Sequence, residues 1–86
     1  MSGDPFAPIA PERRCVQPVP REAPDEPRRH PELGLPVKRW SYTDAEGVPC
    51  FQVWRFRRAD GSKDFRPLSL WRDDKGRMAW LWRAPP

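Results

Sequence analysis

The chain has 86 residues, of which 13 are proline, 16 are lysine or arginine and 12 are aspartate or glutamate, so its formal net charge is +4. A chain of this length forms at most one small domain, whose core contributes only a few kcal/mol of stability. Its apolar runs are far shorter than the about 18 residues of a membrane helix, which excludes a spanning segment. We therefore expect no membrane partner. The two cysteines are expected to be free thiols, which indicates a reducing cytoplasm.

Residues 1–36 contain nine of the thirteen prolines, and five arginines against six acidic residues, a net charge of −1. Prolines at intervals of a few residues prevent a helix, and few apolar side chains are available for a core. This segment is therefore predicted to be a disordered, proline-rich arm. It could act as a tether or a peptide ligand, but a plain linker or leader is the commoner role for such a composition.

From Val37 the pattern changes to short β segments separated by turn residues. Strands are predicted over residues 37–43, 48–57, 63–71 and 78–83. Gly47 supplies the left-handed residue that a type I turn with a bulge requires. Pro49 and Pro67 lack an amide donor, so each should mark a strand start, an edge or an interruption of the ladder. Residues 37–86 are therefore predicted to form a small, mainly β domain, an antiparallel four-stranded meander that twists or curls into a half-barrel.

Both faces of this meander carry apolar side chains. Trp40 and Tyr42 share one face of the first strand, and the second strand directs Phe51 one way and Trp54 the other. A single sheet without a helix leaves one face exposed, and exposed aromatic area usually marks an interaction surface. Either the arm or a partner covers that face, or strong curling buries most of the rings.

Basic and aromatic residues are interleaved in residues 37–86. This range contains eleven lysines and arginines and six acidic residues, so its net charge is +5. This combination indicates polyanion binding, although such charges can also merely solubilise a sheet or pack on its rings. Arginine pairs with phosphate and aromatic rings stack on unpaired bases, which favours single-stranded or junction nucleic acid over duplex. The predicted nucleic-acid-binding residues are Arg55, Arg57, Arg58, Lys63, Arg66, Trp54, Phe56 and Trp71, with Phe65 among them.

No pattern indicates catalysis, a metal or a cofactor. His30 is the only histidine, and with Cys15 and Cys50 it cannot form a zinc site of recognised spacing. The two cysteines are instead expected to be free thiols. Asp73 and its neighbour Asp74 fit a solvated turn, and Asp60 and Asp64 fit a hairpin and charge balance better than an acid/base pair. We therefore expect a protein that is not an enzyme.

Four short stretches carry a resemblance to a known family. They are Tyr42–Gly47, Phe51–Phe56, Lys63–Arg66, and the pair Trp80 and Trp82. Together they resemble the non-catalytic segment that precedes the toprim domain in phage- and plasmid-type DNA primases and primase-helicases, over residues 37–83. The clustered zinc ligands of those primases are missing, and the toprim glutamate and paired aspartates have no counterpart here.

The resemblance implies a nucleic-acid-binding, DNA-replication-associated module of phage or plasmid origin that carries out no catalysis. The alternative is a small phage-type protein-interaction module, an inhibitor or adaptor. Such a module would dock its aromatic face or an edge strand on a host protein.

Overall fold

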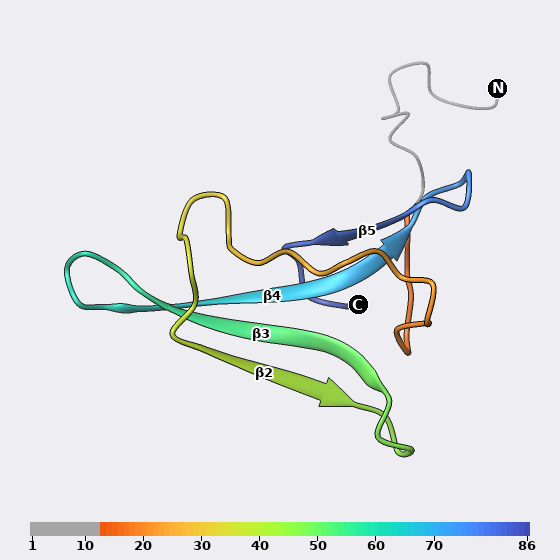
Figure 1. The fold of residues 1–86 in the computed structure, drawn as a ribbon, viewed down its shortest axis with the longest axis horizontal. Helices are drawn as coiled ribbons and strands as arrows, with labels where there is room; N and C mark the ends of the chain where they lie inside the picture. The colour runs from red at the N-terminus through yellow and green to blue at the C-terminus, as the bar shows by residue number, and fades with distance from the viewer. Residues whose placement is uncertain (1–12) are drawn as a thin grey trace, which may run out of the picture.

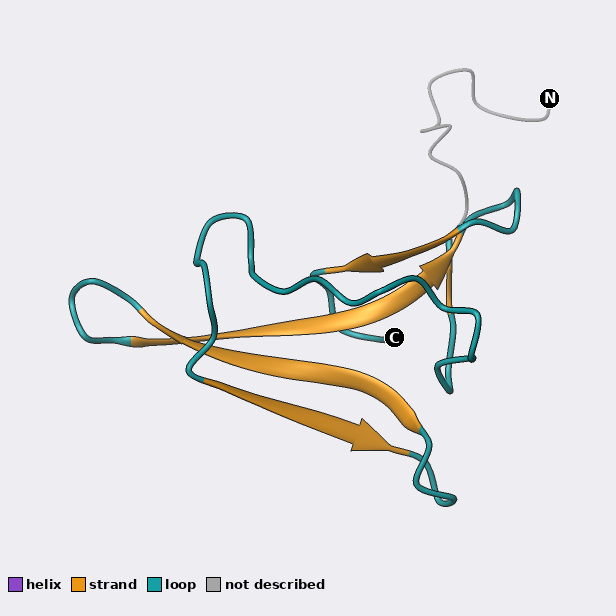
Figure 2. Ribbon diagram, in the orientation of Figure 1, coloured by secondary structure: helices purple, strands orange, loops and turns teal. Residues whose placement is uncertain are grey.

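The computed structural model describes residues 13–86, which contain strands but no helix (Figures 1 and 2). The strands are β1 (Arg14–Cys15), β2 (Lys38–Thr43), β3 (Pro49–Arg57), β4 (Lys63–Arg72) and β5 (Met78–Leu81). Successive strands from β2 to β5 pair antiparallel through short turns, so the predicted mainly β meander is confirmed. The predicted strand ends agree to within one residue, except that β5 stops at Leu81, before a bend.

Strand β4 is the centre of the fold because three other strands pair with it. β3 pairs with its first part, from Lys63 to Leu68, and β5 pairs with its last part, from Ser69 to Arg72. β1 also pairs with Trp71 and Arg72, so β1 and β5 must lie on opposite edges of β4. In Figure 1, β3 and β5 flank β4 on opposite sides, and β2 forms the outer edge beside β3.

The two internal prolines lie where a missing amide is tolerated. Pro49 is the first residue of β3, which is one of the positions considered for it, although the strand was predicted to begin one residue earlier. Pro67 does not interrupt β4, contrary to one of the outcomes considered for it. It pairs with Val53 of β3 and precedes Ser69, the first residue of β4 that pairs with β5, so β4 has a single neighbour at that point.

The three hairpin turns share one backbone geometry. In the first, the Asp44 amide donates to Val48 O at 2.9 Å and the Gly47 amide donates to Asp44 O at 3.0 Å. The same two bonds recur in the turns 58–62 and 73–77. Gly47 has a φ of +82°, and the glycines at the equivalent positions have similar values, as a type I turn followed by a bulge requires. The role predicted for Gly47 is confirmed.

The core lies on one face of the sheet, referred to below as the covered face. Trp54 and Phe56 of β3 and Leu68 of β4 are fully buried there, and Leu33, Trp80 and Trp82 pack against them. Because side chains alternate along a strand, Trp54 and Phe56 point to the same side. Trp82 meets Trp54 edge to face at 4.9 Å between ring centroids, which closes the core from the C-terminal end.

Part of the proline-rich arm supplies the cover for this face. The Trp80 indole Nε1 donates to Pro24 O at 2.8 Å, and the Val19 amide donates to Pro49 O at 2.8 Å. His30 is buried, with its ring 4.7 Å from that of Trp82, centroid to centroid. Its Nδ1 accepts the backbone amides of residues 32 and 33, which fixes the ring in place.

The expectation of a disordered arm therefore does not hold for residues 13–36, and residues 1–12 lie outside the described residues. Composition indicated a segment unable to form a core of its own, because so few of its side chains are apolar. The segment instead finds its partners on a sheet face that already exists, through His30, Leu33 and backbone bonds. One of the two ways considered for covering an apolar face, folding back of the arm, is thus observed.

Candidate nucleic-acid interface

The opposite side of the β2–β3–β4 sheet, referred to below as the open face, carries a second set of aromatic and basic side chains. Strand register places them in rows, because directly paired residues share a face. The rows are Tyr42 with Phe51, then Trp40 with Val53 and Pro67, then Lys38 with Arg55 and Phe65, and finally Arg57 with Lys63. The last row adjoins the β3–β4 hairpin, and the first row adjoins the β2–β3 turn.

Four aromatic rings on the open face form two pairs. Tyr42 and Phe51 stack with ring centroids 4.7 Å apart and planes inclined by 7°. Trp40 and Phe65 stack less closely, at 6.2 Å and 28°, and since they come from β2 and β4 their rings meet above β3. Tyr42 is 49% exposed and Phe65 is 53% exposed, so each pair presents one ring to the outside.

Basic side chains lie at one end of these rings. The Lys38 Nζ is 5.0 Å from the centroid of the Trp40 ring, and the Arg55 Cζ is 6.0 Å from it. The Arg55 Nε is buried and has no hydrogen-bond partner among the described residues. Within residues 13–86, no carboxylate lies within ion-pair distance of Arg55, Arg57 or Lys63. These cations are therefore available to an external anion.

Arg58 and Arg66, which were predicted to belong to the interface, are instead tied to one carboxylate. Arg66 Nε donates to Asp64 Oδ1 at 3.0 Å, and Arg58 pairs with the other oxygen. The hydrogen bonds from Arg66 and then from Arg58 lower the pKa of Asp64, so the carboxylate stays ionised. Arg66 also pairs in register with Trp54, which places it on the covered face. Both arginines are thus removed from the candidate interface.

Three predicted stacking residues are corrected for a simpler reason, which is burial. Trp54 and Phe56 lie in the core, and Trp71 is 9% exposed, so none presents a ring face to a base. Their polar edges are satisfied internally: Trp54 Nε1 donates to Gln52 Oε1 at 2.7 Å, and Trp71 Nε1 donates to Ser69 Oγ at 2.7 Å. The predicted residues that remain on the open face are Arg55, Arg57 and Lys63, together with Phe65.

Sequence reasoning did not include Trp40, Tyr42 and Phe51 among the site residues. The signal was present, because alternation placed Trp40 and Tyr42 on one face and separated Phe51 from Trp54. Alternation shows that two faces differ, but it does not show which one a distant segment will cover. That choice depends on the contacts of residues 13–36.

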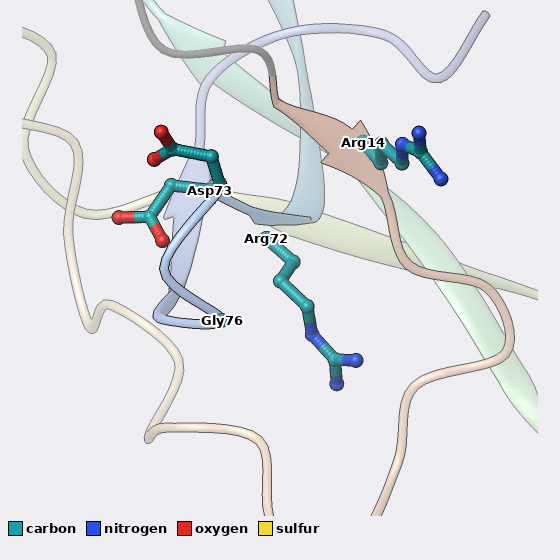
Figure 3. Close-up of a pocket in the computed structure, with 5 residues that line it drawn as sticks. Arg14, Arg72, Asp73 and Gly76 are labelled. Carbon is teal, nitrogen blue, oxygen red and sulfur yellow. The ribbon is translucent and has the colours of Figure 1, made fainter.

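A hollow of about 400 Å³ beside the β4–β5 turn is lined by Arg14, Arg72, Asp73, Asp74 and Gly76 (Figure 3). The Asp73 side chain there stabilises the turn, because its Oδ1 accepts hydrogen bonds from the backbone amides of Lys75 and Arg77, at 2.9 Å each. The bond from the Arg77 amide is the chief reason that the pKa of Asp73 is lowered. Figure 3 shows Arg14 and Arg72 extending away from Asp73, so the hollow gathers no convergent set of groups.

Among the residues that the structure describes, the remaining chemistry-bearing side chains form no further site. Cys15 and Cys50 are free, as expected, and burial and then the proximity of Cys50 raise the pKa of Cys15. Over residues 13–86, no three histidine, cysteine or acidic side chains are grouped closely enough to hold a metal ion. No helix long and apolar enough to cross a membrane occurs in that range.

Comparison with protein-family models, with curated proteins and with solved structures gave no significant match. The resemblance of residues 37–83 to a primase segment therefore rests on the motif residues alone.

Proposed function

We propose that this protein is a non-catalytic module that binds single-stranded nucleic acid across its open face. The observation that carries the proposal is the combination, on one face, of two ring pairs, each with a half-exposed member, and of cations that have no carboxylate partner among residues 13–86. Aromatic faces stack on unpaired bases, with about 1 to 3 kcal/mol gained per base. A duplex hides those base faces, so an unpaired strand is the better ligand.

The arrangement also supplies the electrostatic part of recognition. Arg57 and Lys63 are in register at the hairpin end of the open face, next to the row that contains Arg55. If a strand lies along β3 with its bases on the rings, its phosphates at the hairpin end of the open face would contact these cations. The covered face is occupied by the arm and the C-terminal tryptophans, which leaves the open face as the surface for binding.

The resemblance to the segment ahead of the toprim domain in primases supports a role in DNA replication, in a protein of phage or plasmid type. In that setting the module would hold template or displaced strand while other domains or proteins carry out the chemistry. The ligand is then single-stranded DNA or the unpaired strand at a junction.

The salt dependence of binding tests the proposal. Fluorescence anisotropy of a labelled single-stranded DNA should show log affinity falling linearly with log salt, by about 0.7 per phosphate contact. The double variant Arg57→Gln/Lys63→Gln should flatten that slope by about 1.4, the value for two contacts. The matched control is Arg58→Gln/Arg66→Gln, which removes the same charge from residues already paired with Asp64.

We expect the control to change the slope much less than the test variant. Absence of binding at low salt would remove nucleic acid from the proposal altogether. An equal fall in both double variants would show a diffuse charge effect with no contact at the Arg57–Lys63 row.

A second candidate function is docking to a protein through the free edge of the sheet. β2 has β3 on one side only, and Leu35 and Val37 beside it are 66% and 53% exposed. An unpaired edge offers main-chain donors and acceptors to any extended segment. A pull-down tests this function. It would be favoured if one partner is recovered even after nuclease treatment and if a peptide of that partner, added as a competitor, abolishes the recovery.

A further inference from the structure

The spacing of the two ring pairs matters for the kind of strand that fits them. Trp40 and Tyr42 are two residues apart on β2, a distance of about 6.6 Å along a strand. Successive bases in a stacked nucleic-acid strand are about 3.4 Å apart. Two neighbouring bases therefore cannot occupy both ring pairs while they stay stacked on each other. They can do so only if the strand is unpaired and opened between them.

The charges give this site a direction. The β2–β3 turn beside the Tyr42–Phe51 pair contains Asp44 and Glu46, whereas Lys38 and Arg55 lie at the other end of the rings, in the row of Phe65. Phosphates are repelled at the acidic end and attracted at the basic end. A strand is thus held with its phosphate contacts beyond the Trp40–Phe65 pair.

Arg55 is the cation placed to begin that contact. It lies in register between Lys38 and Phe65, and its Cζ is 6.0 Å from the centroid of the Trp40 ring. Its buried Nε has no partner among the described residues, and a buried donor without an acceptor calls for an explanation. A phosphate or base oxygen that reaches this nitrogen would supply that acceptor.

We propose, building on the function proposed above, that the open face is a two-base site. It holds one unpaired base on the Tyr42–Phe51 pair and the next base on the Trp40–Phe65 pair. Arg55 and Lys38 hold the phosphate beside the second base. The ligand is a short opened segment of a single strand, recognised by stacking and largely independent of base identity, because every base has a π-face.

Oligonucleotides of constant charge test the proposal. The parent strand has twelve abasic nucleotides. Three further strands carry one thymine, two adjacent thymines or four adjacent thymines in place of abasic positions, and the affinity of each strand is measured by anisotropy. Each of the first two thymines should strengthen binding about 5- to 150-fold, and the third and fourth should add little. The all-thymine strand serves as the reference for binding itself.

Variants assign each base to its ring pair. Tyr42→Ala and Phe65→Ala should each abolish the gain from one thymine, and the double variant should abolish both gains. Tyr42→Leu and Phe65→Leu repeat the test with apolar bulk kept on the sheet, in case an alanine variant unfolds. Leu35→Ala, at an exposed apolar residue that belongs to neither ring pair, is the matched control and should change nothing.

Arg55→Gln should reduce the salt slope by about 0.7 and leave the gains from the thymines in place, whereas Arg55→Lys should restore the slope. A gain that keeps growing equally with the third and fourth thymine would overturn the two-base site. So would leucine variants that bind like the parent protein. Failure of the all-thymine strand to bind would instead overturn the function on which this inference rests.

Discussion

Trp54 is fully buried among neighbours from its own strand, from β2 and from the C-terminal segment. Trp82 packs edge to face against its ring, the Arg39 guanidinium lies 4.4 Å from its ring centroid, and Gln52 accepts its indole N–H. Replacing such a residue by alanine removes a large apolar surface and leaves a cavity that a small sheet cannot close. Such a change should strongly lower the free energy of unfolding, because a core of this size contributes only a few kcal/mol in total.

We expect Trp54→Ala to lower the free energy of unfolding by about 3 to 5 kcal/mol, which would leave most of the protein unfolded at 25 °C. Circular dichroism and a thermal melt measure the effect. The matched variant is Tyr42→Ala on the open face, where loss of a half-exposed cross-strand pair costs about 0.2 to 1 kcal/mol. Equal destabilisation by the two variants would show that the open face is part of the core.

At the scale of elements, the arm acts as a structural layer rather than as a tether. β1 pairs with the end of β4, Pro24 O accepts a bond from Trp80, and His30 and Leu33 pack on the core. These contacts bury side chains of the sheet that would otherwise face water. An intact arm should therefore be needed for full stability of the sheet.

Deleting residues 1–36 should lower the melting temperature by at least 8 °C, since loss of about 2 kcal/mol shifts a domain of this size by that much. Deleting residues 1–12 alone keeps every described contact and provides the control. This expectation reverses the one drawn from composition, under which the arm contributes few buried contacts. A full-arm deletion that melts with the parent protein would restore the earlier interpretation.

The strands and turns were predictable because their signals are local. Alternating side chains and a glycine at Gly47, Gly61 and Gly76 define three hairpins whose residues are near neighbours in the chain. The cover was not predictable, because the bond between Trp80 and Pro24 joins residues far apart in sequence. The candidate site was therefore half predicted: Arg55, Arg57, Lys63 and Phe65 lie on the open face, whereas the other predicted rings, Trp54, Phe56 and Trp71, are buried.

At the scale of the whole molecule, the sheet has two unlike sides. One side is packed under residues 13–36 and the C-terminal tryptophans. The other keeps aromatic rings half exposed, next to cations that form no ion pair within the described part of the chain. The net charge of +4 on so small a chain favours its encounter with a polyanion. The rings then decide which side retains the ligand.

The position of β4 between three partner strands has a consequence for how the molecule opens. To expose residues Ser69 to Arg72 of β4, the hydrogen bonds to β5 on one edge must break, and at Trp71 and Arg72 those to β1 on the other edge must break as well. β2 can leave the sheet when only its hydrogen bonds to β3 break. In heavy water, the β4 amides that bond within the sheet should therefore exchange their hydrogens last, at a rate set by global unfolding, and those of β2 should exchange earlier through local fraying. Two-dimensional NMR spectra recorded over time report both rates. Equal protection of β2 and β4 would mean that the molecule opens as a single cooperative unit, with its outer edge as firmly held as its centre.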